Sequence, residues 1–411
     1  MAKAKVAVFH LGFFYSGGGE RLVLEEIRGL RSRGWEVTAF APVVDKKLSY
    51  PELIADMDIK PLLPQLPVWF PSRESVLIIA SCFLLPFIVY KFRSYDVVFA
   101  ANQPGPWFGL VIKKLLGKPY LIYLAQPTRM LHPRPVDLEN GFKLRQELRL
   151  LPYLVKLAKP FISWADRQSV RGALMMLTGG EYIGKILEQT YGKKRTVCYA
   201  GCHPFSEGRL NYGRRWSGRI KVNGVIVKKP YILLTNRHIA HKRFEYAISA
   251  LPAVLRDCPD ARLVITGEET DYTQVLRLLV KRLSLENKID FIGFVGEKDL
   301  VRLYSQAAVY VYPSPQEDFG MGVVEAMAAG TPVVAWNYAG PTDTVIDGKT
   351  GFLSEPYDIL SYAANIIKLL KSPKLVERMG RAGWRRAREK FSYRKHLEVL
   401  ENGLFGAVGK R

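Results

Sequence analysis

Short apolar runs alternate with segments of helical periodicity in both halves of the chain. Val6–Leu11 is apolar, Gly17–Gly19 interrupts the run, Glu20–Arg33 carries apolar residues at helical spacing, and Val37–Phe40 is apolar again. A strand, a glycine loop, a helix and a strand in this order predict a parallel sheet covered by helices. Ligands of such sheets bind at the carboxyl ends of the strands.

The same alternation resumes after Pro230. Strands are predicted at Tyr231–Thr235, Arg262–Thr266, Ile289–Ile292, Val309–Tyr312 and Pro332–Ala335, with helices at Phe244–Arg256, Tyr272–Leu283, Asp299–Ala307 and Gly320–Ala329 between them. The first half adds strands at Asp96–Ala101 and Pro119–Ala125, and the proline-studded stretch Pro51–Pro71 is predicted to be irregular. Both halves therefore indicate doubly wound α/β structure. Ile359–Leu404 predicts a helical end with a break at Ser372-Pro373.

The chain has 411 residues, more than one hydrophobic core usually supports, so two domains are expected. We place the first domain at 1–205, a basic linker with a hairpin at 206–229, the second domain at 230–385, and a C-terminal helix at 386–411 that returns to the first domain. Two such domains are expected to face each other across a cleft framed by the loops that follow the strands.

The formal net charge of +22 favours phosphate-bearing ligands, anionic membranes or nucleic acid, and charge alone does not choose among them. No aromatic-basic motif accompanies the charge, so no nucleic-acid partner is predicted. Gly208–Lys229 is rich in Arg and Lys without an acidic residue, and Ile220–Val227 predicts a hairpin around Asn223-Gly224. This segment is either a solvated linker or a contact surface for a phosphate-bearing acceptor or a membrane.

The four cysteines lack paired zinc spacing, which indicates reduced thiols and a cytoplasmic protein. The start of the chain shows no signal-peptide layout. Val76–Tyr90 is apolar but shorter than the roughly 20 residues of a spanning helix, so it is either a buried or interfacial helix or a membrane span. Together with Pro67–Phe70 it motivates peripheral contact with an anionic membrane at its inner face.

The most informative segment runs from Ser314 to Gly330, directly after the apolar run Val309–Tyr312. Gly320 and Gly322 would let a ligand approach the backbone amides of a helix start, and Gly330 would end that helix. A diphosphate at these amides would have Glu317 on one side and Glu325 on the other. The alternative is a capped, solvent-facing helix with two incidental glutamates.

This segment resembles the E-x7-E signature of the retaining family 4 glycosyltransferases, which share the GT-B fold. The similarity continues through Gly340-Pro341 to Asp347–Leu353. The resemblance implies that Glu317 positions the sugar of a nucleoside diphosphate sugar and Glu325 binds its ribose. It also implies that Arg237 and Lys242, an Arg-x4-Lys pair after a strand, hold the diphosphate and stabilise its charge as the sugar bond breaks. The donor contacts implied are Gly18, Gly19, Phe319, Gly320, Met321, Gly322, Val323 and Glu325.

Tyr15–Arg21 resembles the family's first glycine loop, and its spacing differs from the G-x-G-x-x-G of a dinucleotide site, which disfavours an NAD enzyme. The family usually places a histidine after a strand of the first domain, where this chain has Gln126 followed by Arg129. Gln126 cannot act as a charged acid. This departure from the family pattern concerns sugar recognition at that position, and Arg129 is a candidate contact for the acceptor.

The resemblance implies a retaining hexosyltransferase that acts on a lipid-linked or glycan acceptor, with no metal and no cofactor. Its donor looks most like GDP-mannose, with UDP-sugars open. Two alternatives remain at this point: a catalytically silent nucleotide- or glycan-binding GT-B protein, and an epimerase-like enzyme acting on nucleoside diphosphate sugars.

Overall fold

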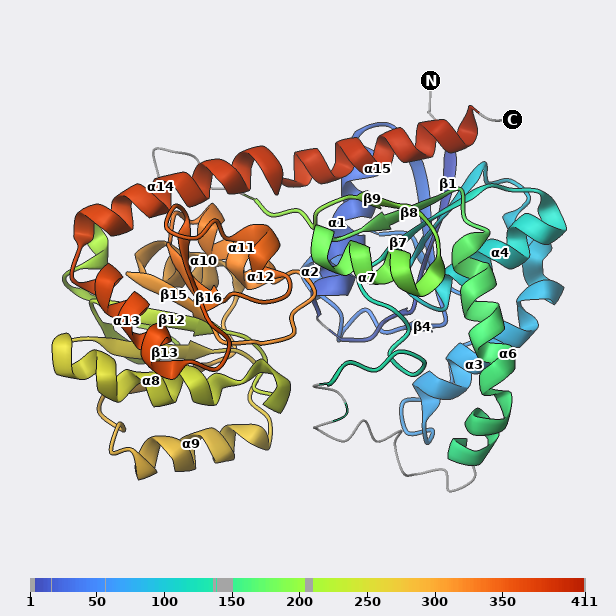
Figure 1. Cartoon of the computed structure of the whole chain (residues 1–411). Helices are drawn as coiled ribbons and strands as arrows, with labels where there is room; N and C mark the ends of the chain where they lie inside the picture. Colours follow the sequence, from blue (N-terminus) through green and yellow to red (C-terminus); the bar gives the residue numbers. More distant parts are fainter. Residues whose placement is uncertain are drawn as a thin grey trace. The chain divides into compact units, whose positions relative to one another are not determined.

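The computed structural model describes residues 4–409 except Ser16, Asp56, 136–137, 139–150 and 204–209. The chain forms two compact units (Figure 1): unit 1 contains Met1–Tyr199 and Arg394–Arg411, and unit 2 contains Ala200–Tyr393. The predicted boundary at 205/206 and Arg209 of the basic segment lie outside the described residues.

Within the described residues, unit 1 holds a seven-stranded parallel sheet of order β5-β3-β1-β6-β7-β8-β9. The strands are β1 (Lys5–His10), β3 (Glu36–Ala41), β5 (Ile59–Pro61), β6 (Val97–Ala101), β7 (Tyr120–Leu124), β8 (Met175–Thr178) and β9 (Arg195–Val197). The helices are α1 (Gly18–Ser32), α2 (Pro51–Ile54), α3 (Arg73–Ile88), α4 (Gly105–Leu116), α6 (Leu151–Arg171) and α7 (Glu181–Tyr191), and a separate short pair joins β2 (Gly12–Phe13) to β4 (Val43–Val44). The central strands are buried apolar runs, as expected of a sheet covered on both faces.

One stretch of unit 1 differs from its prediction. Pro51–Pro71 was expected to be irregular, but it contains α2 and β5, and β5 pairs with β3 at the edge of the main sheet. The strand ends at Pro61, where a proline is tolerated because an edge position does not need its amide hydrogen. The strand β5 was therefore not predicted because this stretch is rich in proline.

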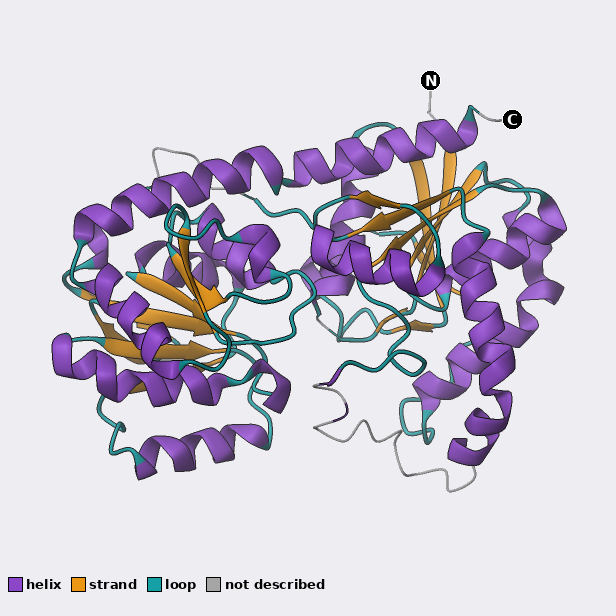
Figure 2. Cartoon of the chain, in the orientation of Figure 1, coloured by secondary structure: helices purple, strands orange, loops and turns teal. Residues whose placement is uncertain are grey.

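Unit 2 holds a six-stranded parallel sheet of order β14-β13-β12-β15-β16-β17 among its described residues. The strands are β12 (Tyr231–Thr235), β13 (Arg262–Thr266), β14 (Ile289–Gly293), β15 (Val309–Tyr312), β16 (Val333–Trp336) and β17 (Gly351–Ser354). The helices are α8 (Phe244–Asp257), α9 (Tyr272–Arg282), α10 (Glu297–Gln306), α11 (Met321–Ala328), α12 (Pro341–Thr344), α13 (Ile359–Leu370) and α14 (Pro373–Lys390). Figure 2 shows helices enclosing the sheet of each unit, so the predicted α/β class is confirmed.

The basic segment is only partly a solvated surface. Its predicted hairpin forms from β10 (Arg219–Val222) and β11 (Val225–Lys228), and it belongs to unit 2. Arg215, in contrast, is completely buried. A linker interpretation based on charge therefore fails at this residue.

Arg215 binds the carboxyl ends of two helices. Its guanidinium donates to the carbonyl oxygens of Tyr304 and Ala307 at the end of α10, and to those of Ala329 and Gly330 just after α11, the latter two at 3.1 Å. Such carbonyls have no partner within their own helix, and a cation there also opposes the helix dipole. Burial lowers the pKa of Arg215 to about 10, so it remains charged at neutral pH.

The C-terminal helical segment contains the predicted break at Ser372-Pro373 and a second one at Phe391-Ser392, which separates α14 from α15 (Tyr393–Val408). Glu401 of α15 accepts hydrogen bonds from Trp35 and Arg33, both at 2.9 Å. His396 lies deeper, with its Nε2 2.8 Å from Glu26 Oε1 and its Nδ1 2.8 Å from the carbonyl oxygen of Tyr199. These contacts join the segment Arg394–Val408 to the rest of unit 1.

His396 faces an acceptor at each ring nitrogen, which favours the doubly protonated imidazolium. Burial opposes that charge, but the neighbouring Cys198 sulfur and the Glu26 carboxylate outweigh it and raise the pKa of His396 well above its ordinary value. Both side chains of the His396–Glu26 pair are essentially inaccessible to solvent. The pair is therefore a buried charge contact that depends on protonation.

We expect this contact to make the stability of unit 1 depend on pH. Because the pKa of His396 is higher in the folded chain, its contribution is complete below the unfolded value of about 6.5 and is lost as the pH rises through the folded value. His396→Gln should cost about 3 kcal/mol at pH 6 and less at high pH. Urea unfolding at pH values from 6 upwards measures how the free energy of unfolding of unit 1 depends on pH. The exposed His132→Gln is the control, and equal pH profiles for wild type and His396→Gln would contradict the assignment.

We also expect Arg215 to be essential for unit 2. Arg215→Lys keeps a charge but loses the planar fork that reaches several carbonyls, so it should cost about 3 kcal/mol or more of unfolding free energy. Arg214→Lys is a matched control, because Arg214 is the adjacent residue and is exposed. Chemical denaturation of the three proteins checks this, and an unchanged midpoint for Arg215→Lys would show that the buried guanidinium is dispensable.

Candidate functional site

The chain of unit 2 reverses its direction of winding between β12 and β15. β13 and β14 follow β12 on one side, whereas β16 and β17 follow β15 on the other. Loops that leave the carboxyl ends of two such strands diverge and open a place for a ligand. The loop after β12 carries Arg237 and Lys242, and the loop after β15 carries Glu317. Three residues predicted from motifs thus lie on the two loops of this switch point.

Glu317 and Lys242 are in direct contact. Lys242 Nζ lies 2.5 Å from Glu317 Oε2, and each side chain is less than one-fifth exposed. The same oxygen accepts a hydrogen bond from the hydroxyl of Tyr312 at 2.7 Å. A largely buried carboxylate and ammonium, in contact where the two loops meet, give the site both signs of charge, which suits a ligand with hydroxyls and phosphates.

The start of α11 presents open amides. Gly320, the residue before the helix, has a φ of 87°, and no side chain caps the helix start. Val323 donates its amide to Gly320 O, so the amides of Met321 and Gly322 are the ones that no backbone carbonyl of the described chain occupies. The phenyl ring of Phe319 is buried against Phe391. An anion would therefore meet the amides of Met321 and Gly322 first.

Two glycines bring backbone segments close together here. A β-carbon on Gly322 would lie 2.3 Å from the hydroxyl oxygen of Tyr310, and one on Gly340 would lie 2.6 Å from the backbone of Phe319. Gly340 also donates its amide to Glu317 O at 2.8 Å. The glycines of the motif are therefore required by packing beneath and behind the loop. Gly330 ends the helix as predicted, with a φ of 70°.

The remaining predicted residues of unit 2 are placed differently. Glu325 lies on the first turns of α11 and accepts a hydrogen bond from the hydroxyl of Tyr304 at 3.0 Å. Arg237 is exposed and pairs with Glu268 at 3.1 Å, so it is not bound to Glu317 as Lys242 is. The structure brings Lys242 and Glu317 together and leaves Arg237 exposed on the same loop as Lys242, paired with Glu268.

Unit 1 offers a second set of predicted residues at its own switch point between β1 and β6. Gly18 and Gly19 begin α1, and a β-carbon on either would meet nothing within 4 Å. Packing within the protein therefore does not explain these two glycines. His10 at the end of β1 lies 3.2 Å from the buried Glu20, a pair that sequence inspection missed because the partners come from different elements.

Gln126 and Arg129 contact each other in the loop after β7. Arg129 Nε donates to Gln126 Oε1 at 2.7 Å. Beside them, the buried Asp166 accepts from Gln103 at 2.8 Å and from Thr128 at 2.7 Å, which fixes the loops after β6 and β7. Burial raises the pKa of Asp166 despite these bonds. Asp166 had no sequence signal, since it lies in an ordinary helical pattern.

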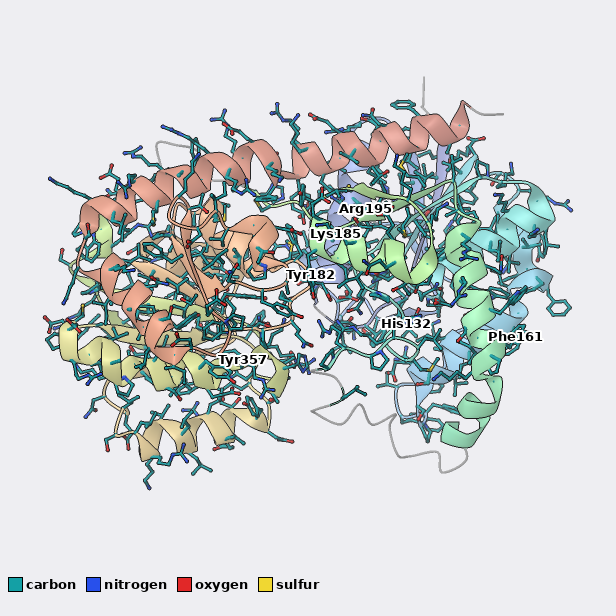
Figure 3. The ribbon with its side chains drawn as sticks, in the orientation of Figure 1. His132, Phe161, Tyr182, Lys185, Arg195 and Tyr357 are labelled. Atoms are coloured by element: carbon teal, nitrogen blue, oxygen red, sulfur yellow. The ribbon has the colours of Figure 1, made fainter. Side chains whose placement is uncertain are left out.

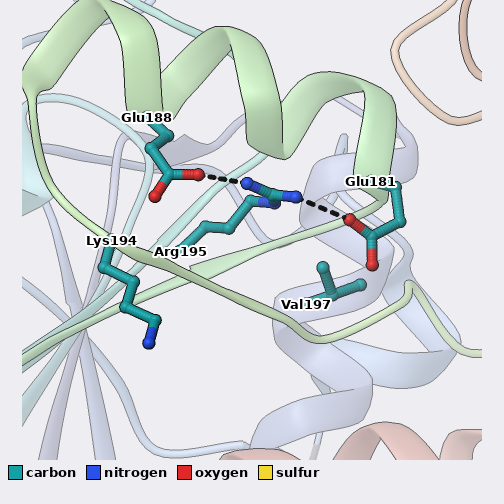
Figure 4. Close-up of a pocket in the computed structure, with 5 residues that line it drawn as sticks. All are labelled: Glu181, Glu188, Lys194, Arg195 and Val197. Carbon is teal, nitrogen blue, oxygen red and sulfur yellow. Dashed lines mark hydrogen bonds and ion pairs between the residues drawn. The ribbon is translucent and has the colours of Figure 1, made fainter.

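A further concavity lies on α7 and β9 (Figure 4). Arg195 lies between two carboxylates there and donates to Glu181 at 2.9 Å and to Glu188. Its charge is already compensated, so this concavity does not resemble an anion site. Across the described residues, no three His, Cys, Asp or Glu side chains gather in a way that would hold a metal ion.

Comparison with known proteins identifies both halves of the chain. The family described as Glycosyltransferase Family 4 matches residues 16–204, and the family described as Glycosyl transferases group 1 matches residues 219–386. The chain belongs to the group 1 glycosyltransferases. It is therefore an enzyme of this class, and the segment with Lys242, Glu317 and Glu325 lies inside the second match.

The relatives and solved structures that this chain resembles agree with its assignment to the group 1 glycosyltransferases. The alpha-1,3/1,6-mannosyltransferase ALG2 of Dictyostelium discoideum is 24% identical over 96% of each chain. The mannosylfructose-phosphate synthase of Agrobacterium fabrum is 31% identical, over 39% of this chain and 37% of that protein. Among solved structures, Anabaena HepE in complex with UDP superposes with a TM-score of 0.74 at 17% identity and covers 98% of this chain and all of that one. The fold is GT-B, with two Rossmann-like units.

Proposed function

We propose that this glycosyltransferase moves a hexose from a nucleoside diphosphate sugar to a lipid-linked or glycan acceptor with retention of configuration. The observation that carries the proposal is the contact between Lys242 and Glu317 on the loops of the unit 2 switch point. A phosphate that approached the amides of Met321 and Gly322 would also attract Lys242, because both present positive charge. Lys242 would then turn from Glu317 to the phosphate, which leaves the Glu317 carboxylate available to the hydroxyls of the sugar.

In this proposal Arg237 and Lys242 stabilise the charge that develops on the departing diphosphate, which needs no proton transfer from the enzyme. Glu325 binds the ribose, and Gly18 and Gly19 leave room for the donor or acceptor on unit 1. The departing phosphate itself takes the proton of the acceptor hydroxyl, on the same face of the sugar. This route is compatible with Gln126, which cannot serve as a charged acid. No metal ion is part of it.

We further propose GDP-mannose as the donor. The support is the name of the relatives that cover nearly the whole chain, the ALG2 mannosyltransferases of Dictyostelium and human. The solved complexes of HepE hold UDP and UDP-glucose instead, so a UDP-sugar is the competing choice. Thermal unfolding with GDP-mannose, UDP-glucose and ADP-glucose separates the donors, because only a ligand that binds the folded protein raises its midpoint.

Two substitutions test the donor site. Lys242→Met removes the ammonium and Glu325→Ala removes the ribose carboxylate, so each should weaken donor binding at least tenfold, which corresponds to the loss of about one charged hydrogen bond. Lys298→Met is the control, because Lys298 is an exposed lysine on α10. Calorimetric titration of the donor measures the affinity. Unchanged affinity in both site variants would overturn the placement of the donor.

Turnover distinguishes the enzyme from its two alternatives. Donor consumption with a glycosylated acceptor and an unchanged anomeric configuration, read by NMR, would support retaining transfer. Donor binding without turnover in the presence of lipid and glycan acceptors would favour a silent binding protein. An epimerised sugar nucleotide without transfer would favour an epimerase.

We also propose that unit 1 attaches peripherally to the inner face of an anionic membrane. α3 and the short helix after it, Arg73–Phe92, form a helical stretch long and apolar enough to cross a membrane, with a mean hydropathy of 2.1. Its buried side chains Leu77, Ser81 and Leu85 follow one stripe, whereas Phe83 and Phe87 on other faces are 69% and 76% exposed. A helix buried along one stripe lies on the protein surface, which supports an interfacial position over a span.

Other exposed aromatic residues of unit 1 support this membrane contact. Trp69, just before α3, is 80% exposed. Phe161 of α6 (Figure 3) stacks on Trp164 at 5.8 Å, and both are more than half exposed. Tryptophan is enriched at the headgroup boundary of a bilayer, and phenylalanine is common on the apolar face of helices that lie in this boundary. The net charge of +22 adds a long-range attraction to anionic lipids.

The membrane proposal predicts that Phe83→Ser with Phe87→Ser weakens partition to vesicles that contain phosphatidylglycerol by at least tenfold, since each buried phenyl ring contributes about 2 kcal/mol. Leu360→Ser is the matched control, a 70% exposed apolar residue on α13 of unit 2. Co-sedimentation at two salt concentrations measures partition. No sedimentation of the wild type, or an equal effect of Leu360→Ser, would contradict the proposal.

A further inference from the structure

Three tyrosines lie beneath the start of α11, and we refer to Tyr304, Tyr310 and Tyr312 as the tyrosine layer. Tyr310 and Tyr312 alternate along β15 and therefore share one face of the sheet, whereas Tyr304 comes from α10. The ring centroids of Tyr304 and Tyr310 are 5.3 Å apart, and those of Tyr310 and Tyr312 are 6.1 Å apart. At most 4% of each side chain is exposed, so the layer belongs to the rigid core of unit 2.

Two of the three tyrosine hydroxyls donate hydrogen bonds to the two glutamates of the motif, Glu317 and Glu325. Tyr312 donates to Glu317 Oε2 at 2.7 Å, and Tyr304 donates to Glu325 Oε2 at 3.0 Å. The hydroxyl of Tyr310 instead lies 3.0 Å from the hydroxyl of Thr235, which in turn lies 2.8 Å from the hydroxyl of Tyr304. The layer therefore contacts both carboxylates of the motif through different tyrosines, and it contains a third tyrosine that contacts neither.

These hydroxyls remain protonated at any physiological pH. Burial raises the pKa of Tyr304 and of Tyr312 well above the ordinary value, and in each case the glutamate at the end of the bond raises it further. A protonated phenol that meets a carboxylate donates a charge-assisted hydrogen bond, which is shorter and stronger than a neutral one. The direction of both bonds is thus fixed from tyrosine to glutamate.

We propose that Tyr312 and Tyr304 are positioning residues that act through Glu317 and Glu325, respectively. The inference rests on the proposed function, which assigns the sugar to Glu317 and the ribose to Glu325. Glu317 lies on a loop, an element that by itself holds a side chain loosely, whereas Glu325 lies on the packed helix α11. Hydrogen bonds to a buried layer on β15 and α10 restrict both carboxylates to one orientation before the donor arrives.

The two tyrosines should affect different steps. Tyr304→Phe loosens the ribose carboxylate, so it should weaken binding of the free nucleoside diphosphate by about tenfold. Tyr312→Phe loosens the sugar carboxylate, so it should leave the affinity for the nucleoside diphosphate unchanged and lower kcat by about 10- to 100-fold. Each change removes one oxygen atom and keeps the ring, so the packing of the layer is preserved.

Tyr231→Phe is the matched control. It removes an equally buried hydroxyl from unit 2, but this hydroxyl donates to the backbone carbonyl oxygen of Leu303 at 2.7 Å, a neutral partner outside the layer, so it should change kcat and nucleotide affinity by less than about threefold. Thermal unfolding is recorded for all three variants. Equal losses of activity in all three, or loss of the fold in Tyr312→Phe, would show that the layer is only structural and overturn the proposal.

Double variants distinguish this inference from the proposed function. If Tyr312 acts through Glu317, adding Tyr312→Phe to Glu317→Gln should lower kcat no further, and the same holds for nucleotide affinity with Tyr304→Phe and Glu325→Gln. Additive losses would overturn the positioning roles while leaving the donor site in place. If neither glutamate variant affects nucleotide binding or turnover, the proposed function fails instead, and the positioning roles fail with it.

Discussion

The buried guanidinium of Arg215 is the contact on which the arrangement of unit 2 depends. It binds the carboxyl ends of α10 and α11 together. α10 carries Tyr304 and α11 begins with the open amides and carries Glu325, so one cation fixes the spacing between a positioning hydroxyl and the carboxylate that it contacts. A buried charge among neutral acceptors is costly unless many hydrogen bonds compensate it. That requirement explains why Arg215 donates hydrogen bonds to carbonyl oxygens at the ends of both helices.

The architecture and the contact at the centre of the candidate site could be predicted because both depend on local pattern. Parallel strands that are buried on both faces read as continuous apolar runs, and β12, β13 and β15 start and end where these runs do. Gly320 and Gly330 delimit α11 because each adopts a positive φ that glycine accommodates easily. The contact between Lys242 and Glu317 follows from topology, since loops after adjacent strands meet at one edge of a sheet.

What could not be predicted depends on contacts between residues that are distant in the sequence. Arg215 looks like any other member of a basic run, and its acceptors lie about 90 to 115 positions further along the chain. Tyr304 and Tyr312 looked like core aromatic residues, which they also are; the placement of the two glutamates above them gives their hydroxyls a charged partner. The edge strand β5 was hidden because a proline-rich sequence favours irregular structure until a neighbouring strand pairs with it.

The anchoring of Arg394–Val408 to unit 1 by His396 and Glu401 makes the two units unequal during synthesis. The chain enters unit 2 after Tyr199 and returns to unit 1 at Arg394. Every residue of unit 2 is therefore made before unit 1 has received its last helix. The strands of unit 1 leave the ribosome before those of unit 2. Glu26 and Trp35 nevertheless stay uncovered until unit 2 has been translated and Arg394–Val408 follows. Unit 1 is thus completed only after all of unit 2 has been made.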